Sequence, residues 1–325
     1  MANAGQGVLL TNDPALIRPG DLVLGWQGEA MPFGVIDFDS DDEGVEEIVL
    51  PSFPLIGVGN ERHPLAAQVD TVVETPVSLA TLVEAIRANP RSAAITVQLL
   101  RHIGGHPIDA ALHHESMAYG LLQGSDEHKA WRAGRTRSGK QVPAPGTVHV
   151  SREGDCLDIV LDRPDASNAI DRGMRDALRE AFTLAALDDD VQVRMRAEGK
   201  AFSIGAELGE FGTTCDPATA HAIRMETLPA HMIARCADRF SAHVQGACVG
   251  TGIEMTAFAN LLTATSTAWF QLPELSMGII PGAGGCVSLT RRIGRQRAAL
   301  MILSGKRIGA KTALDWGLID AIVDD

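Results

Sequence analysis

Residues 244–285 constrain the fold more than any other stretch of this 325-residue chain. An apolar approach ends in a glycine cluster from Gly246 to Gly252, where a helical run opens with Glu254 one turn inside it. Glycine lets the backbone approach a ligand closely, and a helix start offers unpaired N–H groups at a positive dipole end. Such a place suits a developing oxyanion.

A second acid follows in the same stretch. Glu274 comes twenty residues after Glu254 and directly follows Pro273, at the end of the apolar run 268–272. Brought in from a loop, this carboxylate could form an acid/base pair with Glu254. On spacing alone, however, a plain strand-to-helix turn with two solvated glutamates is favoured, because glycine turns and glutamates are common.

The whole string resembles the signature of the crotonase family, the enoyl-CoA hydratases and isomerases. So many matches in order over some seventy residues are far more specific than a lone glycine motif. The matching residues are Gly246, Ala247, Gly250, Thr251, Gly252, Ile253, Glu254, Pro273, Glu274, Gly278, Pro281, Gly282, Ala283, Gly284, Gly285, Leu289, Arg292, Ile293, Gly294, Gly317, Leu318 and Ile319.

The resemblance implies an α/β fold for residues 148–325: a crotonase-like spiral of ββα turns with two roughly perpendicular sheets. It implies an acyl-CoA thioester substrate and the addition of water to a 2-enoyl double bond, or the reverse. By position, the N–H groups of Ala206 and Thr251 would form the oxyanion hole, and Glu254 and Glu274 would be the catalytic acids and bases. Thr251 stands where the family usually has glycine, which keeps the donor but can narrow the pocket.

The resemblance also implies which residues bind coenzyme A and the acyl group. Arg163 and Lys200 are candidate phosphate contacts, although either residue could be merely a solvated cation. The contacts implied are Ala166, Asn168, Ala169, Lys200, Ala201, Phe202, Ser203, Gly205, Glu207, Leu208, Gly250, Gly252 and Pro273.

The reaction stays open between several functions. Two acids favour a hydratase over an isomerase, since an isomerase needs only one base. The fold also hosts other chemistry, so a different acyl-CoA lyase, such as a hydratase coupled to retro-aldol cleavage, remains an alternative. A catalytically silent assembly partner is another. No metal or cofactor is expected beyond the coenzyme A of the substrate, and the resemblance implies a homo-oligomer, a trimer or hexamer.

Charge and cysteine usage limit the binding partners and the cellular compartment that we expect. A net charge of −13 argues against a nucleic-acid or anionic-membrane partner. The five cysteines are scattered without a CxxC pair, which favours reduced thiols in a cytoplasmic protein. No apolar run is long enough to span a membrane, and residues 1–12 lack the basic start of a signal peptide.

The remaining sequence predicts an N-terminal α+β domain at 1–132 and a linker at 133–147. Apolar spacing predicts helices over 79–88, 93–103, 108–122 and 126–132, the first with Ser78 as N-cap. Candidate strands lie at 22–26, 34–38 and 55–59, and a candidate hairpin lies at 148–150 and 157–161. Asp171 is expected to cap a helix that runs to about Leu187, and residues 217–243 are expected to be helical, with Pro217 at the start and Pro229 interrupting. The family's C-terminal helices, which cover the acyl pocket, find no match here. We therefore expect the N-terminal domain or a neighbouring subunit to close that pocket.

Four histidines near the third predicted helix suggest a metal site at first sight. His102, His106, His113 and His114, with Glu115, lack the HExxH arrangement, and adjacent histidines face different sides of a helix. Surface or hydrogen-bonding roles are expected for them.

Overall fold

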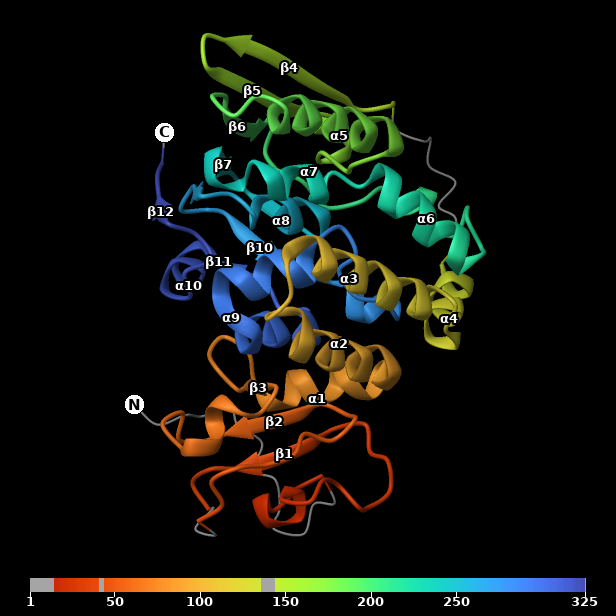
Figure 1. The fold of residues 1–325 in the computed structure, drawn as a ribbon, viewed down its shortest axis with the longest axis vertical. Coiled ribbons are helices and arrows are strands. Elements are labelled where there is room, and N and C mark those ends of the chain that lie inside the picture. Colours follow the sequence, from red (N-terminus) through yellow and green to blue (C-terminus); the bar gives the residue numbers. More distant parts are fainter. Residues whose placement is uncertain (1–14, 41–43, 136–143, 325) are drawn as a thin grey trace.

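Two β-sheets organise the C-terminal part of the chain (Figure 1). The computed structural model describes residues 15–40, 44–135 and 144–324, so most of the predicted linker lies outside the described residues. One sheet has the strand order β12-β9-β7-β6-β5-β4, and the other has the order β11-β10-β8. The strands are β4 (Thr147–Glu153), β5 (Cys156–Asp162), β6 (Gln192–Ala197), β7 (Phe240–Val244), β8 (Ala247–Val249), β9 (Leu261–Ala264), β10 (Trp269–Gln271), β11 (Ile308–Gly309) and β12 (Ala321–Ile322).

The larger sheet is parallel except for its edge. β4 and β5 form the predicted antiparallel hairpin, while β5 to β7, β9 and β12 run parallel. Parallel neighbours need a crossover, and α5 (Arg172–Ala186) supplies it between β5 and β6. Its predicted N-cap, Asp171, accepts a hydrogen bond from the Met174 N–H at 2.9 Å. The α/β architecture expected from the sequence is confirmed.

The predicted helical region 217–243 is only partly helical. It forms α6 (Pro217–Thr227), α7 (Ala230–Arg235) and a 3-10 turn, η5 (Ala237–Arg239), before β7 begins. Pro229 separates the two helices, as expected. The prediction was wrong for the last residues, because β7 alternates buried and half-buried side chains between β6 and β9.

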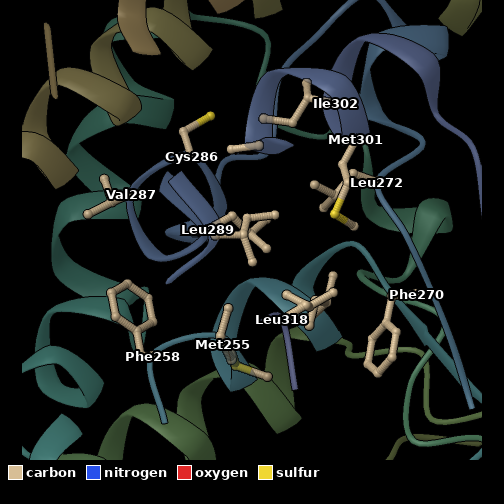
Figure 2. Close-up of a cluster of buried hydrophobic side chains, with 14 of the residues drawn as sticks. Met255, Phe258, Phe270, Leu272, Cys286, Val287, Leu289, Met301, Ile302 and Leu318 are labelled. Carbon is tan, nitrogen blue, oxygen red and sulfur yellow. The ribbon is translucent and has the colours of Figure 1, made fainter. Parts of the chain in front are cut away.

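An apolar cluster packs α8 (Thr251–Thr256) against α9 (Gly285–Ser304) and the short α10 (Ala310–Asp315) region. Figure 2 shows its side chains converging between these helices and β10. Gly294 bends α9 at φ 81°, a conformation that glycine adopts readily. The labelled members are Met255, Phe258, Phe270, Leu272, Cys286, Val287, Leu289, Met301, Ile302 and Leu318.

The N-terminal part is a small parallel sheet followed by four helices. Its strands are β1 (Gly34–Asp37), β2 (Leu55–Val58) and β3 (Thr71–Val72), and its 3-10 turns are η1 (Pro19–Leu22) and η2 (Pro64–Ala67). The helices are α1 (Leu79–Ala88), α2 (Pro90–Ile103), α3 (Ile108–Gln123) and α4 (Asp126–Gly134), all at the predicted places. Ser78 caps α1 as predicted, accepting from the Thr81 N–H.

The strand predicted at 22–26 is wrong. Leu22 ends η1 and is fully buried, but Val23 and Leu24 are 47% and 88% exposed. Gly25 then takes φ 81° and turns the chain. The apolar residues favour a strand locally, but no strand of the described residues pairs with them.

One hydrophobic core joins the N-terminal helices to the rest of the chain. Buried residues of α1, α2 and α3 belong to the same cluster as those of α5, α8 and α9, while a smaller second cluster lies under β1 and β2. Asp70 strengthens this junction, because its buried carboxylate pairs with Arg101 at 2.6 Å and with Arg295 of α9 at 3.4 Å. Helices α1–α3 therefore pack as part of the main body, and the predicted boundary at 133–147 stays a prediction.

All five cysteines lie in the described residues and are free thiols, as expected. Among the helices that the structure describes, none has both the length and the apolar character needed to cross a bilayer.

Candidate active site

Glu254 lies inside the protein on the first turn of α8. Its side chain is 2% exposed, and Oε2 accepts hydrogen bonds from the N–H groups of Ala283 at 2.7 Å and Gly285 at 3.0 Å. These two amides belong to the glycine turn that opens α9. The carboxylate of Glu254 therefore links the first turn of α8 to the first turn of α9, where the helix dipole favours negative charge.

Glu274 approaches the same place from η6 (Glu274–Met277). A Cβ placed on Gly250, whose φ is 49°, would lie only 2.7 Å from Oε1 of Glu274. The side chain is 9% exposed, and its buried Oε2 has no hydrogen-bond partner within the described ranges. Since Glu254 follows Gly250 by one helical turn, the structure brings the two predicted acids to the same end of α8.

Burial gives the two carboxyl groups different affinities for a proton. Removal from water raises the pKa of Glu254 to about 7, and its two amide bonds oppose this rise. Burial, followed by the nearby charge of Glu254, raises the pKa of Glu274 well above its usual range. Two N–H donors favour the ionised form of Glu254, whereas Oε2 of Glu274 has no donor within the described ranges, so a proton shared by the pair is favoured on Glu274.

The two predicted oxyanion segments run side by side. Ser203 donates its N–H to Ala247 at 3.0 Å and accepts from the Val249 N–H at 2.9 Å. Within the described ranges, neither the Ala206 N–H nor the Thr251 N–H has a hydrogen-bond partner, and both residues are partly exposed. These two amides are thus available as donors.

The predicted coenzyme A contacts divide into interior and accessible residues. Asn168, Phe202 and Ser203 are fully buried, so their side chains shape the loops from inside. The Asn168 amide, for example, donates to the carbonyls of Glu198 and Ala201. Ala169, Gly205, Gly250 and Gly252 are also buried; Lys200 and Leu208 are exposed; Ala166, Ala201, Glu207 and Pro273 are intermediate.

Arg163 does not serve the predicted phosphate role. Its side chain is buried and pairs with Glu207 at 2.9 Å, and its other nitrogens donate to the carbonyls of Ala144 and Ala169. Asp171 lies 3.7 Å away on another side. Arg163 instead ties the loop before α5 to the loop after β6, and the prediction was wrong because its ion pair with Glu207 joins residues 44 positions apart.

The sequence reasoning missed two residues of α3. Glu115 is 2% exposed and accepts from the N–H groups of Gly284 at 2.7 Å and Val287 at 3.2 Å. The Tyr119 ring lies against Gly282, where an added Cβ would be 2.2 Å from Cδ2. Helical spacing could have indicated their burial, because both residues share the apolar face of α3 that also presents Ala111 and Leu112.

The neighbouring helix α4 covers the other acid. Nδ1 of its His128 lies 2.8 Å from the Met277 carbonyl at the end of η6, and the backbone of Glu127 and His128 lies against Gly278. Helices α3 and α4 thus contact the turn that holds Glu254 and the turn that carries Glu274.

For the histidines whose contacts the structure shows, the roles are the expected surface and hydrogen-bonding ones. His113 contacts the Asp109 carbonyl at 2.6 Å, and the rings of His106 and His114 lie 4.9 Å apart. The described residues contain no group of three or more His, Cys, Asp and Glu side chains arranged to hold a metal ion.

A cavity of about 510 Å³ lies elsewhere, between residues 61–74 and the bend of α9. Its lining includes none of the predicted site residues, and its arginines are already paired: Arg297 binds Glu74 and Arg295 binds Asp70. It therefore does not compete with the Glu254–Glu274 site.

Comparison with known proteins identifies the same region. The family model described as enoyl-CoA hydratase/isomerase matches residues 152–325. The Bacillus subtilis protein YhaR, named as an enoyl-CoA hydratase/isomerase, is 30% identical over 53% of this chain and 68% of its own length. The mevalonyl-coenzyme A hydratase SIDH of Beauveria bassiana is 33% identical over 57% of this chain and 70% of that protein. A Mycobacterium abscessus crystal structure described as an enoyl-CoA hydratase/isomerase aligns with TM-score 0.51 and 34% identity, over 55% of this chain and 71% of the other.

Proposed function

Because the chain belongs to the enoyl-CoA hydratase/isomerase family, we propose that it adds water to the double bond of a 2-enoyl-CoA thioester, or catalyses the reverse dehydration. The observation that supports this reaction best is the pair of buried carboxyls at the start of α8. Glu254 and Glu274 lie at one site but differ in their N–H donors, since two amides bind Glu254 while Oε2 of Glu274 has no partner within the described ranges. Hydration needs one base and one acid at the same double bond.

The main-chain amides of Ala206 and Thr251 supply the electrophilic part of the mechanism. As donors to the thioester oxygen, they would draw electron density away from C3 and stabilise the enolate that forms when water attacks. Backbone donors do not depend on the side chain, so threonine at position 251 keeps this function. Its methyl and hydroxyl groups then limit the width of the acyl pocket.

The two glutamates have separate roles near neutral pH. Ionised Glu254 takes a proton from water as the oxygen bonds to C3, and protonated Glu274 gives its proton to C2. The proton held by the pair has then moved from Glu274 to Glu254, and exchange with solvent restores the starting state. The resting arrangement of one proton on two close carboxyls is what mutual repulsion in a dry site favours.

The remaining substrate contacts are proposed from the family resemblance. Lys200, exposed at the end of the loop after β6, is the proposed contact for a coenzyme A phosphate. The loops that contain Ala166, Ala201, Leu208 and Pro273 would hold the adenine, pantetheine and acyl parts. The reaction uses coenzyme A only as part of the substrate. A homo-oligomer, expected as a trimer or hexamer, remains a prediction.

We also propose that the N-terminal helices close the acyl pocket. Their contacts with both glutamate-bearing turns support this role, since α3 reaches residues 282–287 and α4 reaches the end of η6. The chain would then enclose its own substrate.

The direct test follows the loss of the conjugated thioester absorbance with 2-enoyl-CoAs of short, long and branched chains. Hydration by the wild type, abolished in Glu254→Gln and Glu274→Gln, supports the proposal. Glu226→Gln, which changes an exposed glutamate of α6, is the matched control and should keep full activity. Turnover that releases a shorter acyl-CoA would instead indicate a retro-aldol lyase. No turnover of any ester, with tight binding to another protein, would indicate a silent partner.

A further inference from the structure

Two carboxylates from distant parts of the chain share one turn. Going along residues 283–287, the N–H of Ala283 donates to Glu254, that of Gly284 to Glu115, that of Gly285 to Glu254 and that of Val287 to Glu115. Glu254 comes from α8, and Glu115 comes from α3 of the N-terminal part. The position of each carboxylate therefore depends on the same short piece of backbone.

The glycines of this turn pack tightly against side chains of the neighbouring helices. An added Cβ on Gly285 would lie 2.5 Å from Cγ of Glu254, and one on Gly282 would lie 2.2 Å from the Tyr119 ring. Gly284 takes φ 102° and packs against Phe258 and Ala230. A shift of α3 would therefore be passed through the turn to the carboxyl of Glu254.

We propose that Glu115 is a positioning residue of the acid/base pair, which acts by holding from α3 the same turn that holds Glu254. This inference rests on the proposed hydration reaction for its kinetic meaning. Glu115 itself does not touch the substrate in this scheme. Its carboxylate fixes the amides of Gly284 and Val287, and the turn then fixes the amides that bind Oε2 of Glu254.

At a pH above its pKa, the charge of Glu115 adds to this geometric role. Burial, and then the charge of Glu254, raises the pKa of Glu115 to about 8, while Glu115 in turn contributes to the raised pKa of Glu274. The charged or titratable groups that face Glu115 from other elements are Glu254 of α8, Glu274 of η6, Cys286 of α9 and Arg224 of α6. Removing the charge at Glu115 should therefore make Glu274 release its proton at a lower pH.

The kinetic test uses Glu115→Gln in the full chain. A glutamine has nearly the same shape, but its NH₂ group cannot accept one of the two amide protons. We expect kcat to fall by about tenfold to a hundredfold with KM nearly unchanged, because small displacements of a catalytic group cost about this much. We also expect the alkaline limb of the pH–kcat profile to move to lower pH.

Asp70→Asn is the matched control, because Asp70 is also a buried carboxylate that accepts a backbone N–H, but in the N-terminal sheet. Its carboxylate accepts from the N–H group of Leu55 at 2.8 Å. The control should lose stability while keeping the wild-type pH profile. If Glu115→Gln behaves in the same way, with kcat unchanged after correction for folded protein, the role is structural and the proposal is wrong.

A second measurement separates this inference from the reaction itself. Carbon-13 NMR of labelled glutamate carboxyls follows the titration of Glu254 and Glu274 in the ligand-free protein, without any turnover. Changed titration of both groups in Glu115→Gln supports the coupling even if no enoyl-CoA is hydrated. Unchanged titration overturns it, whatever the activity. Should Glu115→Gln fail to fold, Glu115→Asp, one methylene shorter and still ionisable, takes its place in both measurements.

Discussion

Glu115 and Glu254 bind alternate amides of a single turn, although they lie on helices that are far apart in the sequence. The turn opens α9, where a helix dipole and unpaired N–H groups favour negative charge. The N-terminal helices therefore contribute to the site as well as to the core. A substitution in α3 or α8 that moves this turn should therefore displace the carboxyl of Glu254.

Gly250→Ala should impair catalysis more than stability. The new methyl group would meet Oε1 of Glu274 at 2.7 Å and displace the acid, and the positive φ costs about 1–3 kcal/mol in addition. Gly154→Ala is the control, since Gly154 has φ 59° but nothing within 4 Å of an added Cβ. Hydration assays with thermal unfolding of both variants check this. Equal activity in the two variants would show that Glu274 does not need its observed position.

Stability should fall as the pH rises from about 4.5 to about 8. The pKa values of Glu254 and Glu115 rise from 4.5 to about 7 and about 8, so the folded state holds more protons than the unfolded chain in this interval. Excess protons on the folded state mean that unfolding becomes easier as the pH rises. Thermal unfolding at a series of pH values measures the slope, and Glu115→Gln should flatten its upper part. A slope unaffected by that change would contradict the assignment.

Hydration should depend on an ionised Glu254 and a protonated Glu274. Because the pKa of Glu254 is about 7, kcat/KM for an enoyl-CoA should rise with pH up to about 7. It should decline once the pH passes the pKa of Glu274, which burial raises well above its usual range. The profile is measured with the free enzyme at low substrate concentration. A maximum at or below pH 5 would refute this division of roles.

Gly282→Ala should loosen α3 without directly touching either catalytic carboxyl. The added Cβ would overlap the Tyr119 ring, and overpacking of this kind costs about 1–3 kcal/mol. Gly105→Ala, with open space around the new methyl group, is the control. Hydrogen exchange of α3 amides and the hydration rate should change together in Gly282→Ala. Faster exchange with an unchanged rate would mean that the position of α3 does not matter for catalysis.

Deletion of residues 1–140 should leave an insoluble or inactive remainder. The deletion uncovers the face of α9 that packs against α1 and α2, and it removes Glu115 and Tyr119 from the site. Expression yield, hydrodynamic size and hydration activity of the truncated chain test this expectation. A soluble and fully active remainder would refute closure of the pocket by the N-terminal helices.

Local sequence patterns predicted the helices of the N-terminal part well, and the family resemblance, not spacing, predicted that Glu254 and Glu274 act as a pair. Ser78 could be read as an N-cap because its partner is only three residues away, and Glu254 and Glu274 lie in one diagnostic stretch. Glu115 could not be placed in the same way, since its amide partners are 169 and 172 residues distant. Arg163 was misjudged for a related reason: a buried ion pair with Glu207 depends on how two loops meet. The apolar residues at 22–24 lacked a pairing strand, which propensity alone cannot show.

Because α1 and α2 pack against α9, these two helices cannot complete their packing until the ribosome has synthesised α9. The Thr71 hydroxyl binds the Gln296 carbonyl across 225 residues, and the first helices find their main apolar partner in the same distant segment. At about 5–20 residues per second, translation leaves these helices uncovered for on the order of 10 s or more. Nascent chains of this protein should accordingly engage chaperones until α9 emerges, and truncated translation products should aggregate.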